Sequence, residues 1–94
     1  MIVSVTELKA HLRIQHDEED VLLTSLLAQS QAIAEEFCRV SFDANAPQTA
    51  RLAVLLMASY LYECRDLSEK NGFNIMNAAF RALLYPHRAP EQLF

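Results

Sequence analysis

Side chains capable of acid–base or metal chemistry are few in this sequence and lie far apart along it. Three histidines, His11, His16 and His87, carry ring nitrogens that ligate metal ions or exchange protons near neutral pH. His11 and His16 are five residues apart, a spacing that does not place them on one face of a helix. We therefore interpret all three as solvated or capping histidines.

The carboxylates that stand close together form two groups. Glu63, Asp66 and Glu69 would share a helix face if one helix ran through them, but acid–base catalysis also needs a pocket, and the sequence indicates none. The run Asp17–Asp20 lacks the alternating ligands and central glycine of a calcium loop. It is typical of a helix start, where Asp17 would cap free N–H groups and the other acids would favour the positive end of the helix dipole.

Cysteine and glycine usage limits the chemistry further. Cys38 and Cys64 show no C-x-x-C or other metal-ligand spacing, so we interpret both as buried free thiols. Gly72 is the one glycine, which excludes a glycine-rich phosphate loop, and neither G-x-S-x-G nor H-E-x-x-H occurs. The sequence thus predicts no catalytic residue, no metal ligand and no cofactor, and we expect the protein not to be an enzyme.

Length and composition favour one small all-α domain spanning residues 1–94. The chain is 52% hydrophobic and has one glycine and three prolines, so long continuous elements with few tight turns are expected. A capping-box pattern from Ser4 to Glu7 opens a short first helix, with Thr6 as an alternative cap. The helix carries Val5, Leu8 and Leu12 at helical spacing.

Two long helices are predicted to follow and to pack antiparallel across a short connection. The earlier one should run from about residue 17 to 38. Its apolar stripe is centred on four large side chains and widened by three more: Leu22, Leu26, Ile33 and Phe37, then Leu23, Leu27 and Ala34. Asn45 is a plausible cap for the later helix, and Pro47 suits its first turn, so this helix should extend to about Arg65.

The later long helix is apolar around its whole circumference over residues 51–63. A surface helix needs only one apolar stripe, whereas a helix that is apolar all round must be enclosed. In so short a chain, the enclosure comes either from the other helices or from further subunits. A core role, with assembly surfaces elsewhere, is the interpretation we favour.

The remaining chain is predicted to form a flexible loop at 66–76, a short helix at 77–84 that ends before Pro86, and an extended tail at 86–94. A loop that ends in exposed apolar groups often becomes ordered against a partner. Candidate interface residues are therefore the loop end and the tail, although the loop residues could also pack into the core. They are Phe73, Ile75, Met76, Leu93 and Phe94.

Charge and hydropathy argue against nucleic-acid and membrane binding. The net charge is −4, and the eight basic residues are scattered rather than clustered into a footprint. The later long helix opens with Gln48, Thr49 and Arg51, as in a DNA-reading helix, but its surface beyond them is apolar. The apolar run at 52–62 is too short to span a bilayer, and no signal peptide is apparent, so we expect a soluble, intracellular protein.

Three blocks of sequence resemble the small head–tail connector proteins of long-tailed phages and prophages. They are V-T-E-L-K-A-H-L-R-I with H-D-E-E-D (Val5–Asp20), L-Y-E-C-R (Leu61–Arg65) and A-L-L-Y-P-H-R (Ala82–Arg88). The blocks stand in family order and cover nearly the whole chain. At one position this chain departs from the family, which often has Gly-Arg where Cys38-Arg39 stands here.

The resemblance implies a structural protein of the virion rather than an enzyme. Family members form a homo-oligomeric ring below the portal protein, extend the DNA channel and give a tail-side completion protein its docking surface, with DNA only as passing cargo. Their C-terminal region is similar to a docking segment toward the portal. An acidic subunit would suit such a conduit, because a wall that repels phosphates does not retain passing DNA.

Two other functions remain open on the residues alone. One is a small cytoplasmic interaction or regulatory module that dimerises through the later long helix. The other is a DNA-binding regulator. Portal and capsid genes beside this one would favour the connector, whereas salt-sensitive binding to duplex DNA would favour the regulator.

Overall fold

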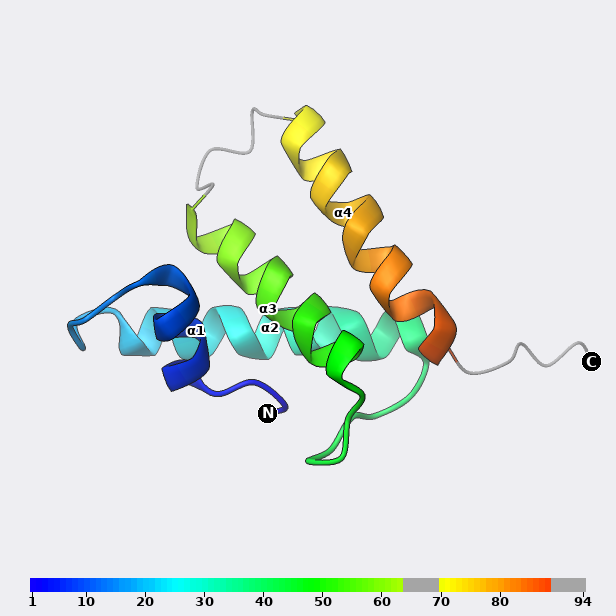
Figure 1. The fold of residues 1–94 in the computed structure, drawn as a ribbon, viewed down its shortest axis with the longest axis horizontal. Helices are drawn as coiled ribbons and strands as arrows, with labels where there is room; N and C mark the ends of the chain where they lie inside the picture. Colours follow the sequence, from blue (N-terminus) through cyan, green and yellow to red (C-terminus); the bar gives the residue numbers. More distant parts are fainter. Residues whose placement is uncertain (64–69, 89–94) are drawn as a thin grey trace, which may run out of the picture.

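The protein folds into an all-helical domain, as the sequence predicts. The computed structural model describes residues 1–63 and 70–88, and the side chains of 70–73 are not included (Figure 1). The helices are α1 (Val5–Leu12), α2 (Asp20–Cys38), α3 (Gln48–Glu63) and α4 (Lys70–Leu84), followed by the 3-10 turn η1 (Tyr85–His87). No strand occurs within the described ranges. In Figure 1, α3 crosses α2 obliquely, and α4 descends beside α3 toward the C-terminal end of α2.

Local sequence determines α1 as expected. The Ser4 hydroxyl accepts from the Glu7 amide at 3.0 Å, and the Ser4 amide donates to a Glu7 carboxylate oxygen at 3.3 Å. This is the predicted capping box, which supplies partners for amides that a helix start leaves unpaired. The helix ends at Arg13, which adopts the left-handed conformation with φ 60°. Its backbone N–H bonds to the Ala10 and Lys9 carbonyls.

The prediction that Asp17 caps the second helix is wrong. Helix α2 begins at Asp20, its N-cap is Glu19, and no side chain caps it. Asp17 instead pairs with the ammonium of Lys9 on α1, and Asp20 lies 3.0 Å from the same ammonium. A charged partner competes well with a backbone N–H for a carboxylate, because both the charge and the hydrogen bond favour the ionised acid.

The buried face of α2 is also rotated relative to the prediction. Its buried residues are Leu23, Leu27, Ser30, Ala34 and Cys38. Leu22 and Ile33, predicted near the centre of the stripe, are 40% and 44% exposed. Leu23, Leu27 and Ala34 belong to the predicted stripe, so its centre is displaced by about 50°, half the angle between successive helical residues. Small side chains on the true face let neighbouring helices approach closely, a feature that hydrophobicity alone does not reveal.

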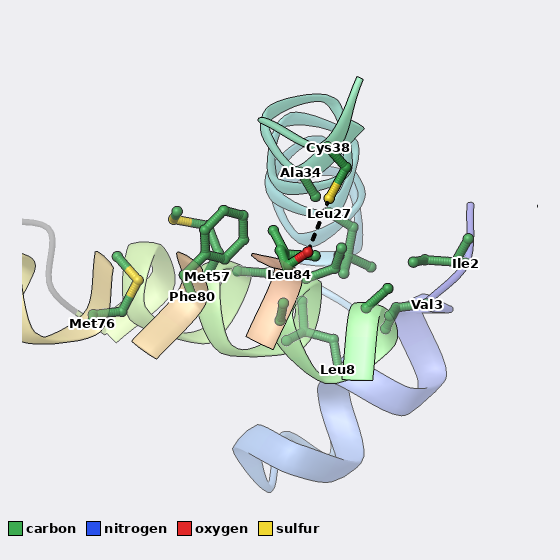
Figure 2. Packing of buried hydrophobic residues seen from close by; sticks show 14 of the residues in the cluster. Ile2, Val3, Leu8, Leu27, Ala34, Cys38, Met57, Met76, Phe80 and Leu84 are labelled. Atoms are coloured by element: carbon green, nitrogen blue, oxygen red, sulfur yellow. Dashed lines mark hydrogen bonds between the residues drawn. The ribbon is translucent and has the colours of Figure 1, made fainter. Parts of the chain in front are cut away.

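Helix α3 is the central element, which supports the core interpretation of its all-round apolar surface. It packs on α1, α2 and α4. Six of its residues are buried: Ala50, Ala53, Val54, Met57, Ala58 and Ser59. Figure 2 shows how side chains from all four helices meet there, with Leu8, Leu27, Met57 and Phe80 among them. The rest of its circumference is mostly half-buried, and Leu52 is 48% exposed.

Helix α4 is longer than predicted. It begins at Lys70 rather than near residue 77, so the predicted loop at 66–76 is helical from Lys70 onward, and 64–69 lie outside the described residues. The segment contains Gly72 and asparagines, which are weak helix formers, but Met76 and Phe80 are four residues apart and both buried. Burial of this pair outweighs the low local propensity. Pro86 lies in η1, just beyond the end of α4, as expected.

Candidate functional site

A cleft of about 430 Å³ lies between α2 and α4. Its walls come from the C-terminal half of α2, from α4 and from the segment that follows η1. The lining residues are Ile33, Glu36, Phe37, Arg39, Asn77, Phe80, Arg81 and Arg88. We call this feature the arginine cleft, because three of its eight lining side chains are guanidinium groups.

Two contacts hold the C-terminal ends of α2 and α4 together beside the cleft. The Cys38 thiol donates to the Leu84 carbonyl oxygen at 3.6 Å (Figure 2). Arg88 donates from Nε to the Phe37 carbonyl oxygen at 3.1 Å. The last carbonyls of a helix lack intrahelical partners and carry the negative end of its dipole, so a guanidinium satisfies them well. The chain after α4 is thereby fastened across the end of α2.

The Phe37 ring lies against two guanidinium groups. Their Cζ atoms are 5.7 Å from its centroid for Arg81 and 4.9 Å for Arg88, and Arg88 also lies 6.0 Å from the Tyr85 ring. Both distances to Phe37 are within the range of cation–π attraction. The ring therefore helps to hold two positive charges on one wall of the cleft.

The cleft is a positive site on an acidic protein. Among the described residues its lining contains Arg39, Arg81 and Arg88 together with the carboxylate of Glu36, whereas the whole chain carries a net charge of −4. Exposed Ile33 adds an apolar part to its wall. Such a lining suits a ligand that combines an acidic group with an apolar one.

Helix end geometry places Arg39 at the cleft. Arg39 terminates α2 in the left-handed conformation with φ 59°. This conformation favours glycine, whereas here a charged residue adopts it. The helix is therefore capped in the left-handed manner without a glycine, and its cap residue lines the cleft.

A second charged cluster lies at the opposite end of α2. Hydrogen bonds and charge from Asp17 and Asp20 raise the pKa of Lys9, and the Lys9 ammonium lowers the pKa of Asp17. Glu18 is exposed beside them, and Val21, immediately after the acids, is 86% exposed. This end of α2 thus presents acids next to an unburied aliphatic side chain.

The side chains singled out for chemistry do not converge. His11 and His16 are exposed, whereas His87 pairs through Nε2 with the Thr49 hydroxyl. Glu63 is exposed at the end of α3, and Asp66 and Glu69 lie outside the described residues. Within residues 1–63 and 70–88, no three His, Cys, Asp or Glu side chains form a group that could hold a metal ion.

Cys38 and Cys64 were both predicted to be buried free thiols, and the structure describes the first of them. Cys38 is a buried free thiol, as predicted, and burial raises its pKa. A thiol with a raised pKa is a poor nucleophile, which fits a packing role. Cys64 lies outside the described residues.

The predicted interface residues fall into three groups. Ile75 is 73% exposed on α4 and available for contact. Met76, one residue later, is buried in the core and supports α4 from inside. Phe73 belongs to α4 but its side chain is not described, and Leu93 and Phe94 lie outside the described residues.

The arginine cleft was missed from the sequence because its residues come from distant segments. Phe37 and Arg88 are 51 positions apart along the chain. Each basic residue, taken alone, looks like an ordinary surface charge. The one available signal was the A-L-L-Y-P-H-R block, whose final arginine forms the contact with Phe37.

The described residues define the class of protein as a small all-helical domain with an arginine-lined cleft between two of its helices. No helix in the described part of the chain is long and apolar enough to cross a membrane. The chain belongs to the phage gp6-like head-tail connector proteins, whose family model matches residues 2–88. No curated protein and no solved structure matches it significantly. The match covers nearly the whole chain and confirms the resemblance found in the three sequence blocks, so the protein has a structural role at the phage head–tail junction.

Proposed function

We propose that this protein is a connector subunit that assembles as a ring below the portal protein. The ring extends the DNA channel and offers a docking surface to a tail-side completion protein. Membership of the connector family over residues 2–88 is the observation that carries this proposal. The subunit waits in the host cytoplasm and enters the virion on assembly, and it has no catalytic role.

The distribution of exposed apolar side chains supports assembly. Val21 on α2, Ile75 on α4 and Tyr85 in η1 are all largely exposed, and they lie on different elements. A closed ring is built from heterologous contacts, in which two different surfaces of the subunit meet. Exposed apolar groups on more than one side of the domain meet that requirement.

Charge supports passage of DNA rather than its capture. The subunit is acidic, with a net charge of −4, so a channel wall made from its acidic surfaces would repel phosphates. An assembled ring with a basic inner wall would contradict this part of the proposal. In the ring we place the arginine cleft at contacts between proteins, away from the DNA path.

The start of α3 does not favour the DNA-binding alternative. Arg51 donates from Nε to the Ile2 carbonyl at 3.1 Å and from Nη2 to both Glu7 carboxylate oxygens at 3.0 and 3.2 Å. Thr49 is paired with His87. Two of the three side chains that would read a DNA groove, Thr49 and Arg51, are therefore engaged within the subunit.

The proposal is tested by measuring molar mass by light scattering, first for the protein alone and then mixed with the cognate portal protein. We expect a complex that contains several subunits per portal assembly. A protein that stays monomeric and elutes separately from the portal would overturn the proposal. Salt-sensitive binding to duplex DNA in its place would favour a regulator.

From the candidate interface residues we retain Ile75, Phe73 and the segment with Leu93 and Phe94 as contact positions toward the portal or the tail. Met76 acts indirectly, because its burial anchors the helix that presents Ile75. Substituting Ile75 by aspartate should weaken binding to the portal complex without unfolding the subunit, since the side chain is exposed.

A further inference from the structure

We propose that the arginine cleft of one subunit receives the N-terminal end of α2 from a second copy of this chain. We call that end the acidic knob and define it as Asp17, Glu18, Val21 and Leu22. The inference rests on the proposed ring and names the contact that would join its subunits.

The lining of the cleft is complementary to a ligand that carries both a carboxylate and an aliphatic side chain. This lining includes the guanidinium group of Arg81, which is exposed and can pair with an incoming carboxylate. Its apolar part, with Ile33 44% exposed and Phe37 half-buried, gains from burial of an aliphatic side chain. An inorganic anion would satisfy only the first of these parts.

The acidic knob offers both parts side by side. Val21 is 86% exposed, the highest value among the large apolar residues in the described part of the chain, and Leu22 is 40% exposed. Glu18 and Asp17 precede them and are exposed. Lys9 already offsets part of the charge on Asp17 and Asp20, so Glu18 is the acid best placed to pair across an interface.

The arrangement of the two surfaces leads to a repeating contact. The acidic knob lies at one end of α2 and the arginine cleft near the other, as Figure 1 shows for the helix ends. A helix of 19 residues is about 28 Å long, so one subunit cannot place its own knob in its own cleft. Contact between two different surfaces is heterologous, and such contacts repeat from subunit to subunit until a ring closes.

Charge reversal tests the contact directly. Sedimentation velocity in low salt over a range of protein concentrations would compare the wild type with Glu18→Arg, Arg81→Glu and the double variant that carries both. Glu63→Arg, an exposed reversal at the end of α3, is the matched control. Circular dichroism melting would confirm that each variant is folded, which is expected because Glu18, Glu63 and Arg81 are all exposed.

We expect each single reversal to weaken self-association about tenfold or more, because it places like charges opposite each other. The double variant should recover most of the loss, since its knob and cleft are again complementary. The control should associate like the wild type. Higher salt should weaken the wild-type contact.

The outcomes separate this inference from the proposed function. If the wild type associates but neither single reversal weakens it, the knob-and-cleft contact is wrong and the ring is formed by other surfaces. If both singles weaken association and the double does not recover, the two residues do not face each other and the inference is overturned. If the wild type binds duplex DNA, and Arg81→Glu abolishes that binding without weakening self-association, the cleft is a phosphate site and the inference is overturned. A wild type that neither associates nor binds the portal overturns the proposed function itself.

Discussion

Arg88 binds the backbone and the ring of the same residue, Phe37. Its Nε donates to the Phe37 carbonyl at 3.1 Å, and its guanidinium carbon lies 4.9 Å from the ring centroid. The two contacts fix the segment after α4 to the last turn of α2, although the residues are 51 positions apart. The wall of the arginine cleft depends on this attachment, so loss of Arg88 should affect both stability and binding.

Replacing Arg88 by alanine should destabilise the domain by about 1–3 kcal/mol, because a hydrogen bond to a charged donor and a cation–π contact are both lost. Urea unfolding followed by circular dichroism measures the change. Arg81→Ala is the matched control, and it should cost at most about 1 kcal/mol, because Arg81 is exposed and its guanidinium lies against the Phe37 ring without the backbone hydrogen bond that Arg88 makes. Equal effects of the two substitutions would contradict the structural role given to Arg88.

The core role of α3 predicts a sharp contrast between two of its positions. Val54 is 1% exposed and Leu52 is 48% exposed. Val54→Asp should unfold most of the protein, because it buries an unpaired charge, whereas Leu52→Asp should leave a folded subunit. Thermal melting distinguishes the two results. Folded protein from Val54→Asp with a normal melting temperature would show that α3 is enclosed by other subunits rather than by its own domain.

The pairing of Lys9 with Asp17 predicts a dependence of stability on pH. The pKa of Asp17 is lowered from 3.8, so its contribution to stability is present above that value and is lost as pH falls through the lower folded pKa. The pKa of Lys9 is raised from 10.5, so its contribution is present below that value and is lost as pH rises through the higher folded pKa. Lys9→Met should remove both dependences. The test is to measure urea midpoints of both proteins at neutral pH, below pH 3.8 and above pH 10.5. If the midpoint of the variant depended on pH as strongly as that of the wild type, the pairing would be contradicted.

The left-handed conformation of Arg13 predicts a stabilising substitution. A residue with a Cβ pays about 1–2 kcal/mol for this conformation, whereas glycine adopts it freely. Arg13→Gly should therefore stabilise the fold by about 0.5–1 kcal/mol, partly offset by the greater entropy of the unfolded glycine chain. Arg13→Ala keeps the strain and serves as the control. A glycine variant less stable than the alanine variant in urea would show that the conformation carries no strain.

Features set by neighbours in sequence were predicted well, and features set by distant contacts were not. The Ser4–Glu7 capping box depends on residues three apart, and the sequence alone revealed it. The predicted start of α2 was wrong because Lys9, eight residues before Asp17, binds the acid that was expected to cap the helix. The predicted start of α4 was wrong because burial of Met76 and Phe80 outweighs the weak helix propensity of the residues before them.

The candidate site shows the same limit. Ile33 and Leu22 are exposed whereas Ala34 and Ser30 are buried, so the packed face of α2 is centred on Ala34, at the edge of the predicted stripe, and includes a polar residue that hydrophobic periodicity does not select. The arginine cleft requires α2 and α4 to meet, and no periodicity within either helix reports that contact. Family resemblance was the one sequence signal that reached function, because it draws on the whole chain at once.

We propose that this connector subunit forms a ring on the portal. Electron microscopy of the wild-type protein mixed with its cognate portal, with Arg81→Glu prepared in parallel, tests it most directly. We predict a continuous ring of subunits on the portal for the wild type, and a sparse or incomplete ring for the variant. A bare portal in the presence of excess folded wild-type protein would contradict the account.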